Sequence, residues 1–170
     1  MKSALLLIVL LAVCAVSQAA ADREESAFDP QQYVRNKIVL ILGSYSDFHD
    51  AHKRASAISR ASKRPFSMQG MIYDKRRGLI LPDDASNPIH SGSYVHRRYN
   101  TASLSEGGED TEFISIERSE AYPRFVPGYY VVVGGIYDKP KEAKAALSVF
   151  TPFVADAYIK KTEIYMGCIH

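Results

Sequence analysis

The 170-residue chain has no tryptophan, two cysteines and almost no excess of either charge. Because Cys14 falls in a segment that we expect to be removed, Cys168 would stand alone and no internal disulfide is expected. The formal net charge of +2, from 21 basic and 19 acidic residues, gives no electrostatic case for binding nucleic acid. No segment after residue 21 approaches the roughly 20 apolar residues of a membrane-spanning helix. We therefore expect no nucleic-acid partner, no transmembrane anchor and a fold that depends on its hydrophobic core.

Residues 1–21 have the pattern of an export signal. Lys2 precedes an apolar run from Ala4 to Val16, and a tail of small residues follows. The pattern predicts that the signal is removed and that the protein is exported, to the periplasm or the medium. The residues before Cys14 also resemble a lipoprotein cleavage box, although Val13 is a poor residue for its last position. A lipoprotein is the alternative prediction.

A strand-to-helix pattern occurs twice in the rest of the chain. The stretches "IVLILGSYSDFHDAHKRASAI" (38–58) and "YYVVVGGIYDKPKEAKAAL" (129–147) each run from an apolar strand through glycine into a helix. Ala51, Ala55 and Ile58 in the first helix match Ala143, Leu147 and Phe150 in the second, at the i, i+4, i+7 spacing of one buried face. Ser46-Asp47 and Asp138 with Pro140 mark the helix starts, and Thr151-Pro152 marks the end of the second helix. A further strand is predicted after each helix, at 66–73 and at 153–161. The chain thus contains two β-α-β units.

The glycines of the two units do not form a phosphate-binding loop. Such a loop needs a spaced Gly-x-Gly-x-x-Gly or a Gly-Lys-Ser/Thr ending, and neither follows these strands. We interpret Gly43 and Gly134 as equivalent strand ends, where a missing side chain permits a sharp turn.

Two β-α-β units in one chain predict the α+β class, with two helices on one face of an antiparallel sheet. This is the split arrangement of a ferredoxin-like sandwich. The predicted organisation after the signal is an N-terminal arm (22–36), repeat one (37–73), an inserted β-rich segment (74–127), repeat two (128–161) and a C-terminal strand (162–170), the last four forming a single domain.

The recurring residues resemble the sporulation-related repeat, or SPOR domain. They are Gly-Ser-Tyr, an aspartate and Asp50-Ala51 in the first unit, then Gly-Gly-Ile, Asp138 and Glu142-Ala143 in the second, closing on "DAYIKK". The resemblance covers about residues 37–73 and 129–161. It implies a ferredoxin-like fold that binds cell-wall glycan strands stripped of their peptide stems.

The chain departs from that family on the sheet. Members commonly have a polar residue, often glutamine, two positions before the strand-ending glycine, whereas this chain has Ile41 and Val132. Strands that are apolar at every position are typical of a sheet covered on both faces. We therefore expect the insert to add strands or to lie across the sheet, with a hairpin at 72–81 and strands at 92–99 and 112–118.

Candidate binding residues lie in this insert and just after it. In "SYVHRRYN" (93–100), a strand would place alternate side chains on opposite faces. Its aromatic rings could stack on sugars and its arginines could grip carboxylates, or it could be an edge strand whose arginines discourage aggregation. The aromatic loop 117–130 could be a recognition surface or a plug that closes the core. The candidates for binding glycan or a partner are Tyr94, His96, Arg97, Arg98, Tyr99, Tyr122 and Tyr129.

No pattern of catalytic or metal-binding residues stands out. There is no Gly-x-Ser-x-Gly elbow. His49 and His52, three apart, are interpreted as part of a solvated first helical turn rather than as metal ligands. The acid pairs Asp83-Asp84 and Glu109-Asp110 are interpreted as solvated loop residues rather than as a glycosidase couple. We expect no enzyme activity, no metal and no cofactor.

Two functional hypotheses remain. The first is an exported, non-enzymatic module that binds peptidoglycan glycan strands, as the resemblance implies. The second is an accessory or inhibitor protein that binds an envelope protein and keeps the fold without the glycan site. An open sheet face lined by tyrosine and arginine favours the first, and a face buried by the insert favours the second.

Overall fold

The computed structural model describes residues 33–81, 94–95, 98 and 112–166. Contacts divide the chain into two units, residues 1–30 and 31–170, and all described residues belong to the second. The predicted signal peptide and both acid pairs lie outside the described residues, as do His96, Arg97 and Tyr99.

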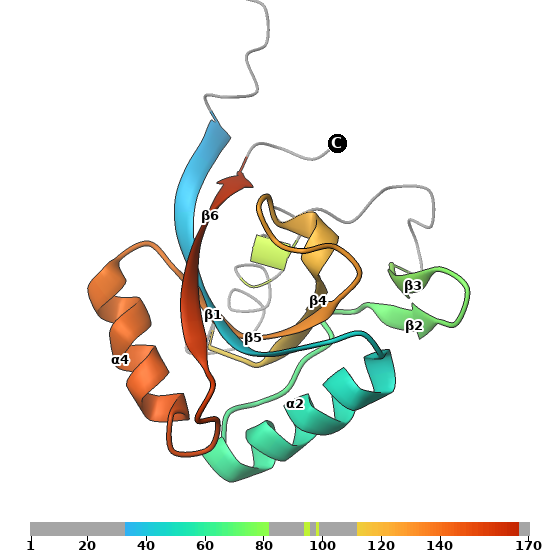
Figure 1. The fold of residues 1–170 in the computed structure, drawn as a ribbon, viewed down its shortest axis with the longest axis horizontal. Coiled ribbons are helices and arrows are strands. Elements are labelled where there is room, and N and C mark those ends of the chain that lie inside the picture. The colour runs from blue at the N-terminus through green and yellow to red at the C-terminus, as the bar shows by residue number, and fades with distance from the viewer. Residues whose placement is uncertain (1–32, 82–93, 96–97, 99–111, 167–170) are drawn as a thin grey trace, which may run out of the picture. The chain divides into compact units, whose positions relative to one another are not determined.

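The described residues form an α+β structure, as predicted (Figure 1). Its main sheet is antiparallel, and β1, at the centre, pairs with both β5 and β6. In the order β4-β5-β1-β6, the strands are Ser115–Arg118, Tyr130–Tyr137, Val34–Tyr45 and Tyr158–Tyr165. A small second sheet pairs β2 (Ile72–Asp74) with β3 (Gly78–Ile80).

Helices α2 (Phe48–Ser62) and α4 (Pro140–Phe150) begin where the sequence predicts. The Asp47 carboxylate accepts hydrogen bonds from the backbone N–H groups of His49 (2.7 Å) and Asp50 (3.1 Å), which caps α2. Pro140 occupies the first turn of α4, where its missing N–H costs nothing. Helix α4 ends at Phe150 with Thr151 as its C-cap, at the predicted Thr-Pro stop.

Both helices pack on one face of the sheet. Ala51, Ala55 and Ile58 of α2 are buried there, and they are the residues whose spacing predicted the helix face. Phe150 of α4 joins them. The sheet contributes Leu40, Leu42, Ile116 and Val132 to this helix-side core. Val132 therefore faces the helices and is not on the opposite surface.

The opposite face of the sheet is covered as well. Val39 and Ile41 of β1 and Val131, Val133 and Ile164 of the neighbouring strands are buried there. The residues that pack on them are Met71, Tyr94, Val95, Ala121 and Tyr122, all from the segment between α2 and β5. The prediction that part of the insert (74–127) lies across the sheet is confirmed by Tyr94, Val95, Ala121 and Tyr122, and Met71, just before the insert, packs there too.

The glycines lie within the strands and not at their ends, so that prediction was wrong. Strand β1 continues to Tyr45 and β5 to Tyr137, and the β1–β5 register shifts at Leu42 and at Gly134, the extra residues of two β-bulges. A side chain at Gly43 would collide with the Tyr45 ring, and one at Gly135 would collide with the Tyr137 ring. In both repeats, therefore, a glycine (Gly43 or Gly135) is covered by the ring of the tyrosine that follows two residues later in the same strand.

The partner strand of the first unit was also predicted wrongly. Of residues 66–73, Phe66 forms only an isolated parallel bridge with Ile114, and the rest leads into the β2–β3 hairpin. Strand β4 supplies the missing strand beside β5, from far along the chain. The predicted hairpin at 72–81 and the strand within 112–118 are confirmed.

The ends of the sheet differ from the predicted boundaries. Strand β1 begins at Val34, inside the predicted arm. Strand β6 is one continuous strand where two, 153–161 and 162–170, were predicted. Turns fill 151–157, with Val154 N–H donating to Phe150 (3.0 Å) and Ala157 N–H to Val154 (3.2 Å). Because the backbone groups of these residues form hydrogen bonds within the turns, they do not pair with β1, and strand β6 begins at Tyr158.

Candidate functional site

A buried polar network fastens the insert to the sheet. Glu117 of β4 is fully buried, and Arg98 Nη2 lies 3.2 Å from its Oε1. The Ser115 hydroxyl donates to the same oxygen at 2.5 Å, and the Tyr122 hydroxyl donates to Oε2. Arg98 also donates to the Phe113 carbonyl (2.9 Å). The ion pair thus has additional hydrogen bonds at both ends, which a buried pair requires in order to be tolerated.

Tyr94 extends this network. Its hydroxyl accepts a hydrogen bond from the Arg118 N–H at 2.8 Å, and its ring stacks on Tyr122 at 6.2 Å between centroids. Tyr94, Val95 and Arg98 are helical, so the prediction of a strand at 92–99 was wrong. The neighbours Tyr94 and Val95 are both buried, which the alternation of a one-sided strand would not allow.

Three of the predicted binding residues are therefore inside the protein. Tyr94, Arg98 and Tyr122 are buried and contact the sheet or one another. They close the sheet face and are not available to a ligand on the surface. Tyr129 is the predicted site residue that the structure places on the surface, with 39% of its area exposed.

The buried tyrosines predict a sharp alkaline limit to stability. Burial and the Glu117 charge raise the pKa of Tyr94 and of Tyr122 well above 10, and burial, aided by Glu112, raises the pKa of Tyr137 to about 12. The folded state holds these protons more tightly than the unfolded state. Their contribution to stability is therefore complete below pH 10. It is lost for Tyr137 as the pH rises from 10 to about 12, and for Tyr94 and Tyr122 it continues to fall at higher pH.

We expect tyrosinate absorbance to rise in two stages during an alkaline titration. The exposed rings should ionise first, and the buried rings should ionise together with the loss of near-ultraviolet circular dichroism. The same titration in denaturant should give a single stage near pH 10. If the folded protein gave that single stage without unfolding, the assignment of these rings to the interior would be wrong.

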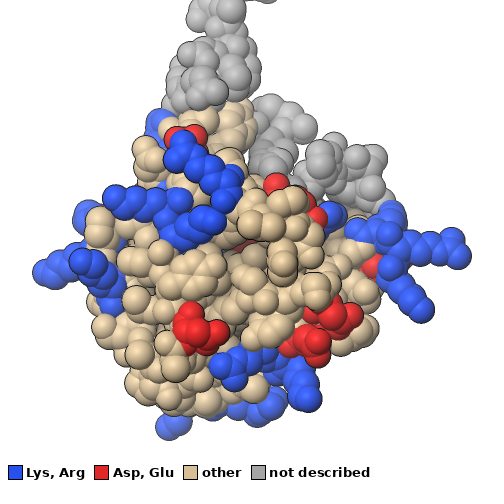
Figure 2. Space-filling model, viewed as in Figure 1, with Lys and Arg blue, Asp and Glu red and all other residues tan. Residues whose placement is uncertain are grey.

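The exposed apolar side chains Val126, Tyr129 and Tyr158 form what we call the tyrosine patch. Their exposed fractions are 68%, 39% and 46%. They surround an open cavity of about 230 Å³, which is also lined by Ser44, Ser119, Phe125 and Lys160. The cavity lies between the loop before β5 and the first residues of β6. Figure 2 shows uncharged side chains across the centre of the face in view, with lysine and arginine mainly at its margin.

The loop that carries the patch is held in place at both ends. Ser119 N–H donates to the Tyr129 carbonyl (2.9 Å), and the Tyr129 N–H donates to the Ser119 hydroxyl (3.0 Å). The Lys160 ammonium donates to the Arg124 carbonyl (2.9 Å) and lies 4.3 Å from the centre of the Phe125 ring. The exposed side chains therefore stand on a fixed backbone, which lowers the entropy cost of binding.

The sequence left two interpretations of the aromatic loop, and the structure contains both. Tyr122 and Phe125 close the core beneath the loop, whereas Val126 and Tyr129 are exposed above it. Val126, Tyr158 and Lys160 were not predicted from the sequence. Their proximity depends on the place of β6 beside β1, and the repeat pattern alone did not indicate it.

The histidines that the sequence singled out pack against aromatic rings. Residues 33–81, 94–95, 98 and 112–166 contain no group of three or more potential metal ligands. His49 packs edge-on against Tyr73, and His52 packs in the same way against Phe66. Within that part of the chain, no helix is both long enough and apolar enough to cross a membrane.

A second cavity, of about 520 Å³, lies beside α4, and its acidic residues form ion pairs. Glu112 pairs with Arg64, Asp138 with Lys37 at 2.5 Å, and Glu142 with Lys139 at 3.4 Å. Each carboxylate at this cavity therefore has a basic partner within 4 Å.

Comparison with known proteins adds no relative. No family model matches the chain. Neither the curated proteins nor the solved structures contain a significant match.

Proposed function

We propose that the chain is an exported, non-enzymatic module that binds a protein partner through the tyrosine patch. The observation that carries this proposal is the contrast between the two surfaces. The sheet face opposite the helices is packed, whereas Val126, Tyr129 and Tyr158 are exposed around a cavity. Export rests on the signal pattern of residues 1–21.

The strand order supports a diverged SPOR-like, ferredoxin-like fold. Along the chain, the four strands of the main sheet are β1, β4, β5 and β6. If they are numbered 1 to 4 in that order, their positions across the sheet, from β6 to β4, read 4-1-3-2. Helix α2 follows the first of these strands and α4 follows the third. This is the connectivity of a split β-α-β pair. A glycan site on the sheet would need the face that Tyr94 and Tyr122 cover, so we propose that the fold is kept and that site is not.

The chemistry of the patch suits a protein better than a sugar chain. Tyrosine is enriched at the centre of protein interfaces, and charged side chains are depleted there. The cavity is smaller than the roughly 300–1,000 Å³ of pockets that enclose small molecules. The cavity could instead hold one apolar side chain of a partner protein. Tyr129 and Tyr158 would surround that side chain, which would be a hot-spot residue of the interface.

Photocrosslinking from within the patch tests the proposal. A photoreactive amino acid at Val126 should give discrete, protease-sensitive adducts in cells that make the protein. The same amino acid at Val149 is the matched control, because Val149 is an exposed valine on α4. Adducts from Val126 should disappear when Tyr129 is changed to alanine. Equal adducts from both positions, or none from Val126, would contradict the proposal.

A sedimentation assay with cell-wall sacculi separates the two ligand classes. We expect no binding to sacculi before or after an amidase removes the peptide stems. Binding that increased after stripping and was lost in Tyr129→Ala would assign the patch to glycan and would overturn the protein-binding proposal.

A further inference from the structure

Strand β6 is an open edge of the main sheet. It pairs with β1 on one side and is the last strand in the order β4-β5-β1-β6. Its eight residues contain no proline, and the β1–β6 register runs without a bulge. Proline and bulges are two of the devices that prevent an edge strand from pairing with another chain, and charged side chains are a third. Strand β6 has neither proline nor bulge but contains Lys160, Lys161 and Glu163, so its charges decide which strand it can accept.

The hydrogen-bond register shows which backbone groups face outward. Met166 N–H donates to the Tyr33 carbonyl at 2.8 Å, in line with the pairing of Val34 with Tyr165. Because backbone groups alternate along a strand, the even-numbered residues of β6 bond to β1. Ile159, Lys161 and Glu163 therefore direct their N–H and C=O groups away from the sheet. Among the described residues, no strand or turn bonds to these outward groups.

We propose that two copies of this chain pair through β6, antiparallel and centred on Thr162. If the two copies are related by a two-fold axis perpendicular to the sheet, opposed residues have their side chains on the same face. Because side chains alternate between the faces along a strand, the residue numbers of each opposed pair must then add up to an even number. Centring on Thr162 places Lys161 opposite Glu163 of the second copy, and Glu163 opposite its Lys161. Both are positions whose backbone groups face outward, so they form hydrogen-bonded pairs.

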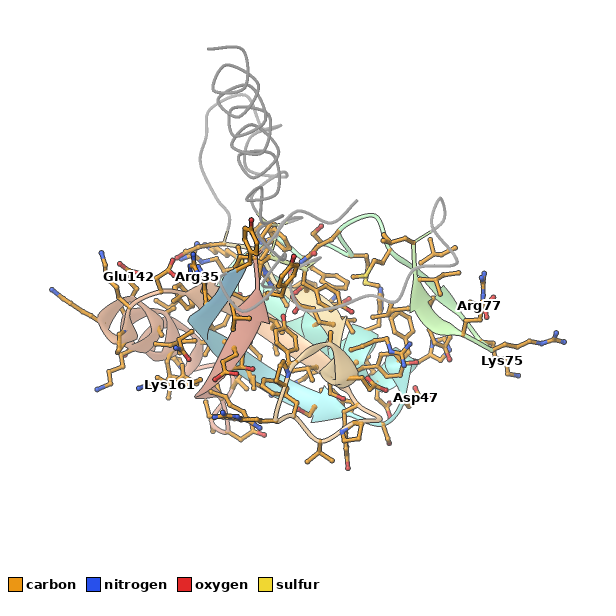
Figure 3. All side chains as sticks on the ribbon, turned by 90° about the horizontal axis from the view of Figure 1, so that it is seen from above. Arg35, Asp47, Lys75, Arg77, Glu142 and Lys161 are labelled. Carbon is orange, nitrogen blue, oxygen red and sulfur yellow. The ribbon has the colours of Figure 1, made fainter. Side chains whose placement is uncertain are left out.

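Charge selects this register over its neighbours. Centring on Lys161 would place that lysine opposite its own copy, and centring on Glu163 would do the same for the glutamate. Opposite charges directly across two strands are stabilising, and like charges are destabilising. Lys161 is exposed, and Figure 3 shows it at the margin of the structure, away from the hairpin that carries Lys75 and Arg77.

One existing contact has to be compatible with this pairing. Glu163 lies 3.4 Å from Arg124 Nη2, and both side chains are largely exposed. Such surface pairs contribute little to stability. Glu163 can therefore keep this contact or exchange it for Lys161 of the second copy.

Charge reversal tests the proposal on the full chain by sedimentation velocity over a concentration series. The wild type should show a concentration-dependent dimer. Lys161→Glu and Glu163→Lys should each weaken the dimer roughly thirty-fold, because two attractive pairs become repulsive. The double variant Lys161→Glu/Glu163→Lys should restore it. Lys141→Glu, at an exposed lysine of α4, makes the same charge change away from β6 and should have no effect.

A wild type that stays monomeric at millimolar concentration would overturn the proposal. A dimer that Lys161→Glu does not weaken, or that the double variant does not restore, would overturn it too. Lys161→Pro provides a second check, because it removes an outward N–H while leaving the bonds to β1. It should abolish the dimer with an unchanged circular dichroism spectrum. The test uses no residue of the tyrosine patch, so its result is independent of the proposed function.

Discussion

Glu117→Gln is expected to lower the free energy of unfolding by about 3–5 kcal/mol. The glutamine would keep the size of the side chain but remove its charge. Arg98 would then be a buried cation without its counter-ion, and the Tyr122 hydroxyl would lose a charged acceptor. Breaking one partner of a buried pair has a large effect because the remaining charge is already out of water.

Urea denaturation, followed by circular dichroism, measures this change. Glu120→Gln is the matched control, because Glu120 pairs with Arg118 at 3.1 Å in a partly exposed position. Its loss should change the free energy of unfolding by about 1 kcal/mol or less. Equal effects of the two substitutions would show that the Arg98–Glu117 pair is not buried.

Ile41→Gln should have an effect of similar size, about 3–5 kcal/mol of destabilisation. This change introduces the residue type that SPOR domains commonly have at that position of the strand. Ile41 packs beneath the insert. Glutamine there would remove apolar contacts and bury an amide among Val39, Val131 and Tyr122 without an evident partner.

The matched control is Ile72→Gln, at an isoleucine of β2 that is half exposed. It should change stability by about 0.5 kcal/mol or less. A tolerated glutamine at position 41 together with acquired binding to stripped sacculi would mean that the sheet face opens readily. That result would favour the glycan hypothesis.

Local signals were sufficient for the helices and for the fold class. Asp47 predicted the start of α2, Pro140 that of α4, and the repeated apolar spacing predicted the buried helix faces. The unbroken apolar residues of β1 and β5 also predicted a sheet covered on both sides, which Ile41 and Val133 bear out. These features depend on residues within one turn or one strand of each other.

The errors concern contacts between distant segments. Strand β4 (Ser115–Arg118) takes the place beside β5 that was predicted for residues 66–73. No local pattern shows which of two distant segments will pair with β5. Tyr94 and Arg98 were predicted to lie on a surface strand, where the ring could stack on a sugar and the arginine could grip a carboxylate. Arg98 is held inside by Glu117, 19 residues further along the chain, and Tyr94 by the Arg118 N–H, 24 residues further along. The tyrosine patch likewise joins the loop before β5 to the start of β6, which are brought together only by the strand order.

Thiol labelling of the native protein tests most directly whether the sheet face is closed. Val133→Cys places a thiol on that face, and Ile72→Cys places one on the surface, each in the full chain with Cys14 and Cys168 changed to serine. We predict that the thiol at 133 reacts roughly a thousandfold more slowly, since an opening free energy of about 4 kcal/mol corresponds to that factor. Equal rates at the two positions in the folded protein would show an open face and would contradict the account.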